Sequence, residues 1–236
     1  MRERPLRATR GSAEVLSRES RSARRVHNGG HFSSVAHPMP RAALTVVLAL
    51  FASFAFADER RDAVPVAALF AQLEKADAVV EGARDSRHLL YVFFDANCYY
   101  CHLTWKALQP YEAVGLQVRW VPVAYQQPSS AGRAAAIMES PDRVGALRLN
   151  ETGYDRAHFD GAIAPLPKPT PARVKSLEAN TMLMRAFGAP GTPAVVWKDA
   201  RGNVQFRAGV PRRSELPALT GLPAQPNDDP ELAQFR

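Results

Sequence analysis

The stretch Leu89-Leu-Tyr-Val-Phe-Phe-Asp-Ala-Asn-Cys-Tyr-Tyr-Cys-His102 joins a continuous apolar run to two cysteines. Residues 89–94 are all apolar, which is typical of a central strand whose two faces are both buried. A helix is expected to follow from residue 98 to about residue 113. The quoted stretch therefore predicts a buried strand that leads into a helix, with both cysteines at the junction.

The spacing of the cysteines is informative because the whole chain of 236 residues holds two, Cys98 and Cys101. A C-x-x-C motif between a buried strand and a helix is the layout of a thioredoxin-like redox site. Unpaired backbone N–H groups and the helix dipole stabilise a thiolate at the helix N-terminus, where Cys98 lies. Cys101 lies one turn further on and can resolve a mixed disulfide. We interpret Cys98 as the attacking nucleophile and Cys101 as the resolving thiol.

Other interpretations of the motif compete with this one. A structural disulfide across two intervening residues would constrain the unfolded chain little. A zinc site would need two ligands besides the cysteines, and these would have to come from His88, His102, His158 or carboxylates, which is an unusual set. No metal is therefore expected. In a chaperone-like peptide-binding module, the disulfide would be passive.

A sharper alternative comes from His102, which completes the C-x-x-C-H signature of c-type haem attachment. Met138, Met182 or Met184 could then be axial ligands. These methionines are explained more simply as helix core, and a cytochrome accounts for nothing else downstream. We therefore favour the redox site and expect no cofactor, with a c-type electron carrier as the alternative.

The rest of the chain supplies the other parts of an α/β fold. Strands are expected over residues 116–124, 194–197 and 204–208, with a turn at residues 199–203. Helices are expected over residues 66–80, 133–139, 141–149, 171–187 and 214–220. This order indicates an α/β layout. Residues 222–236 are expected to form a flexible tail.

Residues near the cysteines are further candidates. Pro193 opens a strand, and in a thioredoxin-like fold a cis-proline opposite the C-x-x-C exposes the backbone of the residue before it, here Thr192, to an extended peptide. Tyr99 and Tyr100, with Trp105 as rim or core, are expected to form an aromatic rim for substrate. Asp95 is interpreted as ending the strand and capping the helix, with proton transfer near the thiols as the alternative.

The positive charge of the chain is concentrated in its first 57 residues. They hold nine arginines and three glutamates and so carry +6 of the formal net charge of +7. The remainder is close to neutral, so no nucleic-acid partner is expected.

The same segment resembles an export leader. An uncharged run at residues 42–57 follows Arg41 and ends in Ala55-Phe-Ala57. A basic flank, a short apolar run and an A-x-A end predict a secretory signal peptide cleaved after Ala57; an uncleaved anchor or a buried helix is the alternative. Since Met39 can start a compact signal peptide, 39–57, residues 1–38 are interpreted as a non-native or extended leader. Residues 58–84 are then a linker-like helix.

Three motifs resemble the DsbC/DsbG family of bacterial periplasmic thiol:disulfide interchange proteins, and DsbG more closely. They are residues 91–101, the block Glu178-Ala-Asn-Thr-Met-Leu-Met184, and Gly191-Thr-Pro-Ala194 followed by Asp199-Ala-Arg-Gly202. The resemblance covers about residues 69–222, and it implies a thioredoxin-like domain at residues 85–221 with a helical insertion at about 129–187. It implies that Cys98 and Cys101 are the redox pair and that Thr192 and Pro193 are the Thr–cis-Pro element. It also implies cysteine-containing exported proteins as substrates and a DsbD-type membrane reductase as a partner.

This chain departs from the family at two points. Family members commonly have Pro and Tyr between the cysteines, and the change to Tyr99-Tyr100 affects the redox potential. They also carry a separate dimerisation domain ahead of a linker helix. Here about thirty residues lie between Asp58 and the first strand, so that domain is not evident. A monomeric reductase or oxidase is therefore considered beside an isomerase.

Overall fold

The computed structural model describes residues 64–235, which belong to one compact unit. The predicted leader, the start at Met39 and the cleavage after Ala57 lie outside the described residues. Within residues 64–235, no helix has the length and apolar character needed to cross a membrane.

The described strands form one sheet in the order β1-β3-β2-β4-β5. β2 and β3 are parallel, while the pairs β1–β3, β2–β4 and β4–β5 are antiparallel. The strands are β1 (Val79–Gly82), β2 (Leu89–Asp95), β3 (Gln117–Val123), β4 (Ala194–Lys198) and β5 (Val204–Ala208). The helices are α2 (Val66–Leu73), α3 (Tyr99–Glu112), α4 (Ser130–Met138), α5 (Arg143–Thr152), α6 (Pro171–Ala186), α7 (Leu216–Thr220) and the 3-10 helix η1 (Pro230–Phe235).

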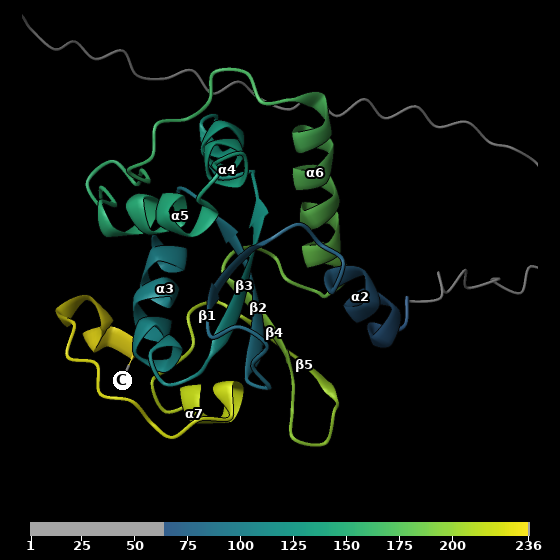
Figure 1. Ribbon diagram of the computed structural model, residues 1–236, viewed down its shortest axis with the longest axis vertical. Helices are drawn as coiled ribbons and strands as arrows, with labels where there is room; N and C mark the ends of the chain where they lie inside the picture. Colours follow the sequence, from purple (N-terminus) through teal and green to yellow (C-terminus); the bar gives the residue numbers. More distant parts are fainter. Residues whose placement is uncertain (1–63, 236) are drawn as a thin grey trace, which may run out of the picture. The chain divides into compact units, whose positions relative to one another are not determined.

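Helices cover both faces of the sheet, with α3 and α7 on one side and α2 and α6 on the other (Figure 1). Successive side chains of β2 point to opposite faces. Leu90, Val92 and Phe94 therefore join the cluster beneath α3, whereas Tyr91 and Phe93 join the cluster beneath α6. The apolar run is thus buried on both faces, and the predicted α/β, thioredoxin-like fold is confirmed.

The helical insertion lies between β3 and β4 and consists of α4, α5 and α6. α5 reaches the loop before the cysteines. The side-chain amide of Asn150 donates to the carbonyl of Ala96 at 3.0 Å, and the hydroxyl of Tyr154, just after α5, donates to the carbonyl of Asn97 at 2.8 Å. The insertion therefore supports the segment that leads into Cys98.

The helix predicted over residues 66–80 is wrong in its second half. α2 ends at Leu73, and Val79 and Val80 belong to β1, where they pair with Trp120 and Arg119 of β3. Two successive β-branched residues favour a strand, and burial of Val79 against the α3 core stabilises the pairing. The segment interpreted as a linker-like helix thus adds an edge strand to the sheet.

The C-terminal segment predicted to be a flexible tail instead packs against α3. Leu232 of η1 is buried in the α3 core. The ammonium of Lys106 lies 2.7 Å from the carboxylate of Asp229 and 2.5 Å from that of Glu231. The prediction of a flexible tail was based on the Pro and Asp content of this segment. It was wrong because the buried Leu232 and the ion pairs with Lys106 attach the segment to the domain.

Candidate functional site

Cys98 is the N-cap residue of α3, and its sulfur accepts a hydrogen bond from the backbone N–H of Cys101 at 3.2 Å. Both cysteines are free. Cys98 is 2% exposed and Cys101 is 1% exposed. An N–H donor at a helix N-terminus stabilises negative charge on the sulfur that it contacts.

The pKa values of the two thiols are shifted in opposite directions. The pKa of Cys98 is lowered, chiefly by the hydrogen bond with the Cys101 thiol and further by Thr192 and the backbone N–H of Cys101, although burial opposes the shift. The pKa of Cys101 is raised well above that of an ordinary thiol, because the thiol is buried and because of its hydrogen bond and charge interaction with Cys98. Cys98 is therefore the thiol that ionises more readily, while Cys101 holds its proton.

Thr192 and Pro193 lie against the cysteine pair, and the peptide bond between them is cis. The sulfur of Cys98 lies 3.5 Å from the carbonyl oxygen of Thr192, to which the thiol donates. The fold thus brings four of the six predicted site residues into one cluster.

A loop after β3 holds Thr192 in place. The hydroxyl of Tyr125 accepts the backbone N–H of Thr192 at 2.7 Å and lies 3.1 Å from its Oγ1. The side-chain amide of Gln126 donates to the same Oγ1 at 3.0 Å. The sequence interpretation missed Tyr125 and Gln126. Their position after a strand parallel to β2 was the available signal, because the carboxyl ends of neighbouring parallel strands meet at one edge of a sheet.

Asp95 ends β2 as predicted, but its carboxylate does not cap α3, since Cys98 occupies that position. The carboxylate instead accepts four hydrogen bonds at 2.8–3.1 Å. The donors are the backbone N–H groups of Asn97, Tyr125 and Gln126 and the hydroxyl of Ser130. Asp95 therefore connects the strand before the cysteines to the loop that holds Thr192.

The predicted aromatic rim is present in part. Tyr100 is 54% exposed, and its ring centroid lies 5.8 Å from that of the half-buried Tyr99. Trp105 takes the alternative role: it is buried in the core, and its indole N–H donates to the carboxylate of Glu81 at 3.1 Å.

His102, the residue on which a haem site would depend, is enclosed by protein. Its ring stacks on Tyr154 with centroids 4.9 Å apart. Its Nδ1 lies 3.6 Å from Glu151 and its Nε2 lies 3.4 Å from Glu231. Haem attachment requires both sulfurs and a histidine nitrogen to face the macrocycle, so these enclosed groups do not fit a haem.

The three methionines considered as axial haem ligands do not share one environment. Met138 and Met184 are buried in hydrophobic clusters, and Met182 is exposed. Within residues 64–235, no group of three or more His, Cys, Asp or Glu side chains is placed to hold a metal ion.

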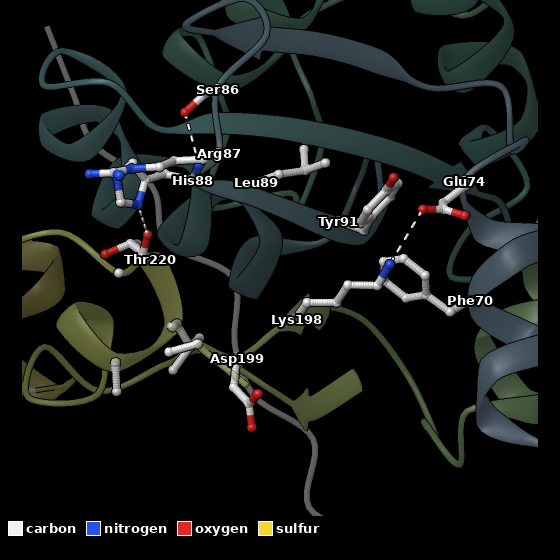
Figure 2. Close-up of a pocket in the computed structure, with 14 residues that line it drawn as sticks. Phe70, Glu74, Ser86, Arg87, His88, Leu89, Tyr91, Lys198, Asp199 and Thr220 are labelled. Atoms are coloured by element: carbon white, nitrogen blue, oxygen red, sulfur yellow. Dashed lines mark hydrogen bonds and ion pairs between the residues drawn. The ribbon is translucent and has the colours of Figure 1, made fainter. Parts of the chain in front are cut away.

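A surface cavity of about 600 Å³ lies apart from the cysteine pair (Figure 2). It is lined by residues from α2, α7 and the ends of β2 and β4 that face away from Cys98, including Leu89 and Lys198. In Figure 2 the ammonium of Lys198 points to Glu74, 3.7 Å away, and Nδ1 of His88 to the carbonyl of Thr220, 3.0 Å away. These polar groups are bonded within the protein, and the cavity is not part of the candidate site.

Known proteins similar to this chain have a thioredoxin-like domain or are thiol:disulfide interchange proteins. Residues 74–220 match the family model described as a thioredoxin-like domain. The chain is 30% identical over 154 residues to the thiol:disulfide interchange protein DsbG of Pseudomonas aeruginosa, a match that covers 65% of this chain and 59% of that protein. It is 33% identical over 126 residues to DsbC of Haemophilus influenzae, covering 52% of this chain and 49% of that protein. The chain thus spans less than two thirds of the length of these relatives.

Two solved structures share the fold. The catalytic domain of Proteus mirabilis ScsC gives a TM-score of 0.51 at 24% identity, covering 66% of this chain and 94% of that domain. A periplasmic thioredoxin-like protein from Salmonella enterica serovar Typhimurium gives a TM-score of 0.53 at 20% identity, covering 65% of this chain and 94% of that one.

Proposed function

This chain belongs to the thioredoxin-like domain family and is similar to its DsbC and DsbG members, and we propose that it is an exported thiol:disulfide oxidoreductase. The contact of the Cys98 sulfur with the N–H of Cys101 and the carbonyl of Thr192 carries the proposal. It places an ionisable thiol, a buried second thiol and the backbone of Thr192 in one cluster.

The first step is attack on a substrate disulfide. The Cys98 thiolate attacks one substrate sulfur, a bond forms between the two sulfurs, and the other substrate sulfur leaves as a thiolate that takes a proton from water. Cys98 is 2% exposed, so its sulfur must become more accessible for this attack than it is in the structure. Thr192 would pair with the backbone of the substrate.

The second step is resolution. Cys101 attacks the Cys98 sulfur, the bond between Cys98 and the substrate breaks, and the proton that Cys101 gives up goes to the second substrate sulfur, which leaves as a thiol. Two electrons have then moved from the dithiol to the substrate, and the protein is left with a Cys98–Cys101 disulfide. By similarity to DsbC and DsbG, a membrane reductase of the DsbD type would restore the dithiol.

The compartment and the clients follow from the leader. The signal-peptide pattern that ends at Ala57 supports export to the periplasm, where disulfides form and persist. The clients would then be exported proteins that contain cysteines. Tyr99, Tyr100, Thr192 and Pro193 would bind them beside Cys98.

Trapping tests the mechanism. A Cys101→Ala variant keeps the nucleophile and removes the resolving thiol, so mixed disulfides with client proteins should accumulate on it in the periplasm. They should be released by a reductant and be absent from the Cys98→Ala, Cys101→Ala double variant. A Cys101→Ala variant that traps no client under acid quenching would overturn the proposal. Client binding that persists in the double variant would favour a peptide-binding module instead.

A further inference from the structure

Phe159 combines two features that are unfavourable in a folded protein. Its side chain is 53% exposed, and its backbone has φ 55°. A bulky residue in the left-handed region is strained, and such strain persists only where the surrounding structure imposes it, often at functional sites.

Two sets of contacts impose this conformation. The backbones of Asp155 and Asp160 exchange hydrogen bonds of 2.8 and 3.1 Å, which closes the turn that contains Phe159. The side-chain amide of Gln127 donates to the carbonyl of Phe159 at 2.7 Å. The backbone is thereby fixed while the ring remains exposed.

The ring of Phe159 contacts the side chain of Tyr99, the residue that follows Cys98. Its centroid is 6.3 Å from that of Tyr99 in an edge-to-face arrangement, and Tyr99 directly follows Cys98. Phe159, Tyr99 and Tyr100 form a continuous group of rings, which we call the aromatic shelf.

The loop that contains residues 125–127 contacts both the aromatic shelf and Thr192. Gln127, which holds Phe159, lies in the same loop as Tyr125 and Gln126, which hold Thr192. A polypeptide that pairs with Thr192 while its cysteine meets Cys98 would therefore bring neighbouring side chains close to the aromatic shelf.

We propose that the aromatic shelf determines substrate specificity by binding an aromatic or large aliphatic side chain next to the reacting cysteine of a client. The inference rests on the proposed function and names its substrate class. The preferred substrates are disulfides whose cysteines are flanked by such side chains, rather than disulfides with polar neighbours. Aromatic rings in edge-to-face or stacked contact with a client ring would supply the selectivity.

Two peptides that differ only beside their cysteine test the inference. One has Phe and the other Ser on both sides of the cysteine, and each is a mixed disulfide with a coloured thiol whose release follows attack on the peptide sulfur. For the reduced protein, the Phe peptide should react about tenfold faster, a ratio equivalent to about 1.4 kcal/mol. Phe159→Ala should bring this ratio below about three, while Phe159→Tyr should keep it.

Two further variants sharpen the result. Phe159→Asn removes the ring with a residue that tolerates positive φ, and it should behave like Phe159→Ala. Val114→Ala changes an apolar residue that is 48% exposed beyond the other end of α3, and it should leave the ratio unchanged. A ratio near one in the unsubstituted protein, or one that Phe159→Ala and Phe159→Asn do not lower, would overturn the inference alone. If neither peptide reacts, the proposed function fails with it.

Discussion

The carboxylate of Asp95 accepts the backbone N–H of Tyr125 at 2.9 Å, although the two residues lie 30 positions apart. This bond joins the end of β2, three residues before Cys98, to the loop that holds Thr192. One buried carboxylate therefore helps to hold both the segment that precedes Cys98 and the loop that contacts Thr192.

Asp95→Asn should destabilise the fold strongly. The substitution replaces a charged acceptor of four hydrogen bonds with an amide, whose NH2 group must face donors. Loss of a buried, charge-assisted network of this kind costs about 2–4 kcal/mol. Urea unfolding of the reduced protein at neutral pH measures the change. Asp142→Asn is the control, because Asp142 is an exposed N-cap where Asn serves equally well, and it should change stability by less than about 0.5 kcal/mol. Similar losses for both variants would contradict the role given to Asp95.

Alkylation of the reduced protein should modify Cys98 and spare Cys101. The reactive form is the thiolate, and the pKa of Cys98 lies below the 9.0 of an ordinary thiol. The rate of reaction with iodoacetamide should therefore reach half its maximum at a lower pH than it does for a free cysteine. In Cys101→Ala, the inflection should move to higher pH, because the variant lacks the thiol that contributes most to lowering the pKa of Cys98. Mass spectrometry that found Cys101 modified first would contradict the assignment.

Glu112 should make the fold less stable as pH rises. Both oxygens of its carboxyl group are buried, and neither meets a donor in hydrogen-bonding geometry among residues 64–235. Burial and the nearby Glu81 raise the pKa of Glu112 from 4.5 to about 8. The folded state then binds a proton that the unfolded state has released, so this contribution to stability is complete below about pH 4.5 and is lost as pH rises through about 8.

Glu112→Gln tests that sign. The variant keeps the shape of the neutral acid and removes the titration, so its stability relative to the unsubstituted protein should increase from pH 5 to pH 9 by about 4 kcal/mol. Chemical unfolding at several pH values measures the difference. Glu178→Gln, at an exposed position of α6, should show no such trend. A stability difference between Glu112→Gln and the unsubstituted protein that did not change with pH would contradict the raised pKa of Glu112.

The predictions that succeeded depended on strong local signals. The apolar run at residues 89–94, followed by two cysteines three apart, indicated a buried strand and a helix with both thiols at its start. Proline-rich segments separated the helices predicted in the insertion. Thr192 and Pro193 were chosen as candidates because Pro193 directly precedes a predicted strand. Each of these signals is contained in a few neighbouring residues.

The parts that were missed depend on contacts between distant residues. Tyr125, Gln126 and Phe159 carry no motif, and they become part of the site because Asp95 and Gln127 bond to their backbones across the sheet edge. The C-terminal segment reads as a loose tail until Lys106 and the α3 core are placed beside it.

The sequence by itself determined the fold class and placed Cys98 and Cys101 together at the start of one helix, because hydrophobic periodicity and the C-x-x-C spacing act over one strand and one helical turn. The tertiary structure alone decided that the loop after β3 supports Thr192 and that the ring of Phe159 contacts Tyr99. These properties arise from burial and from hydrogen bonds between segments brought together only when β2 and β3 pair.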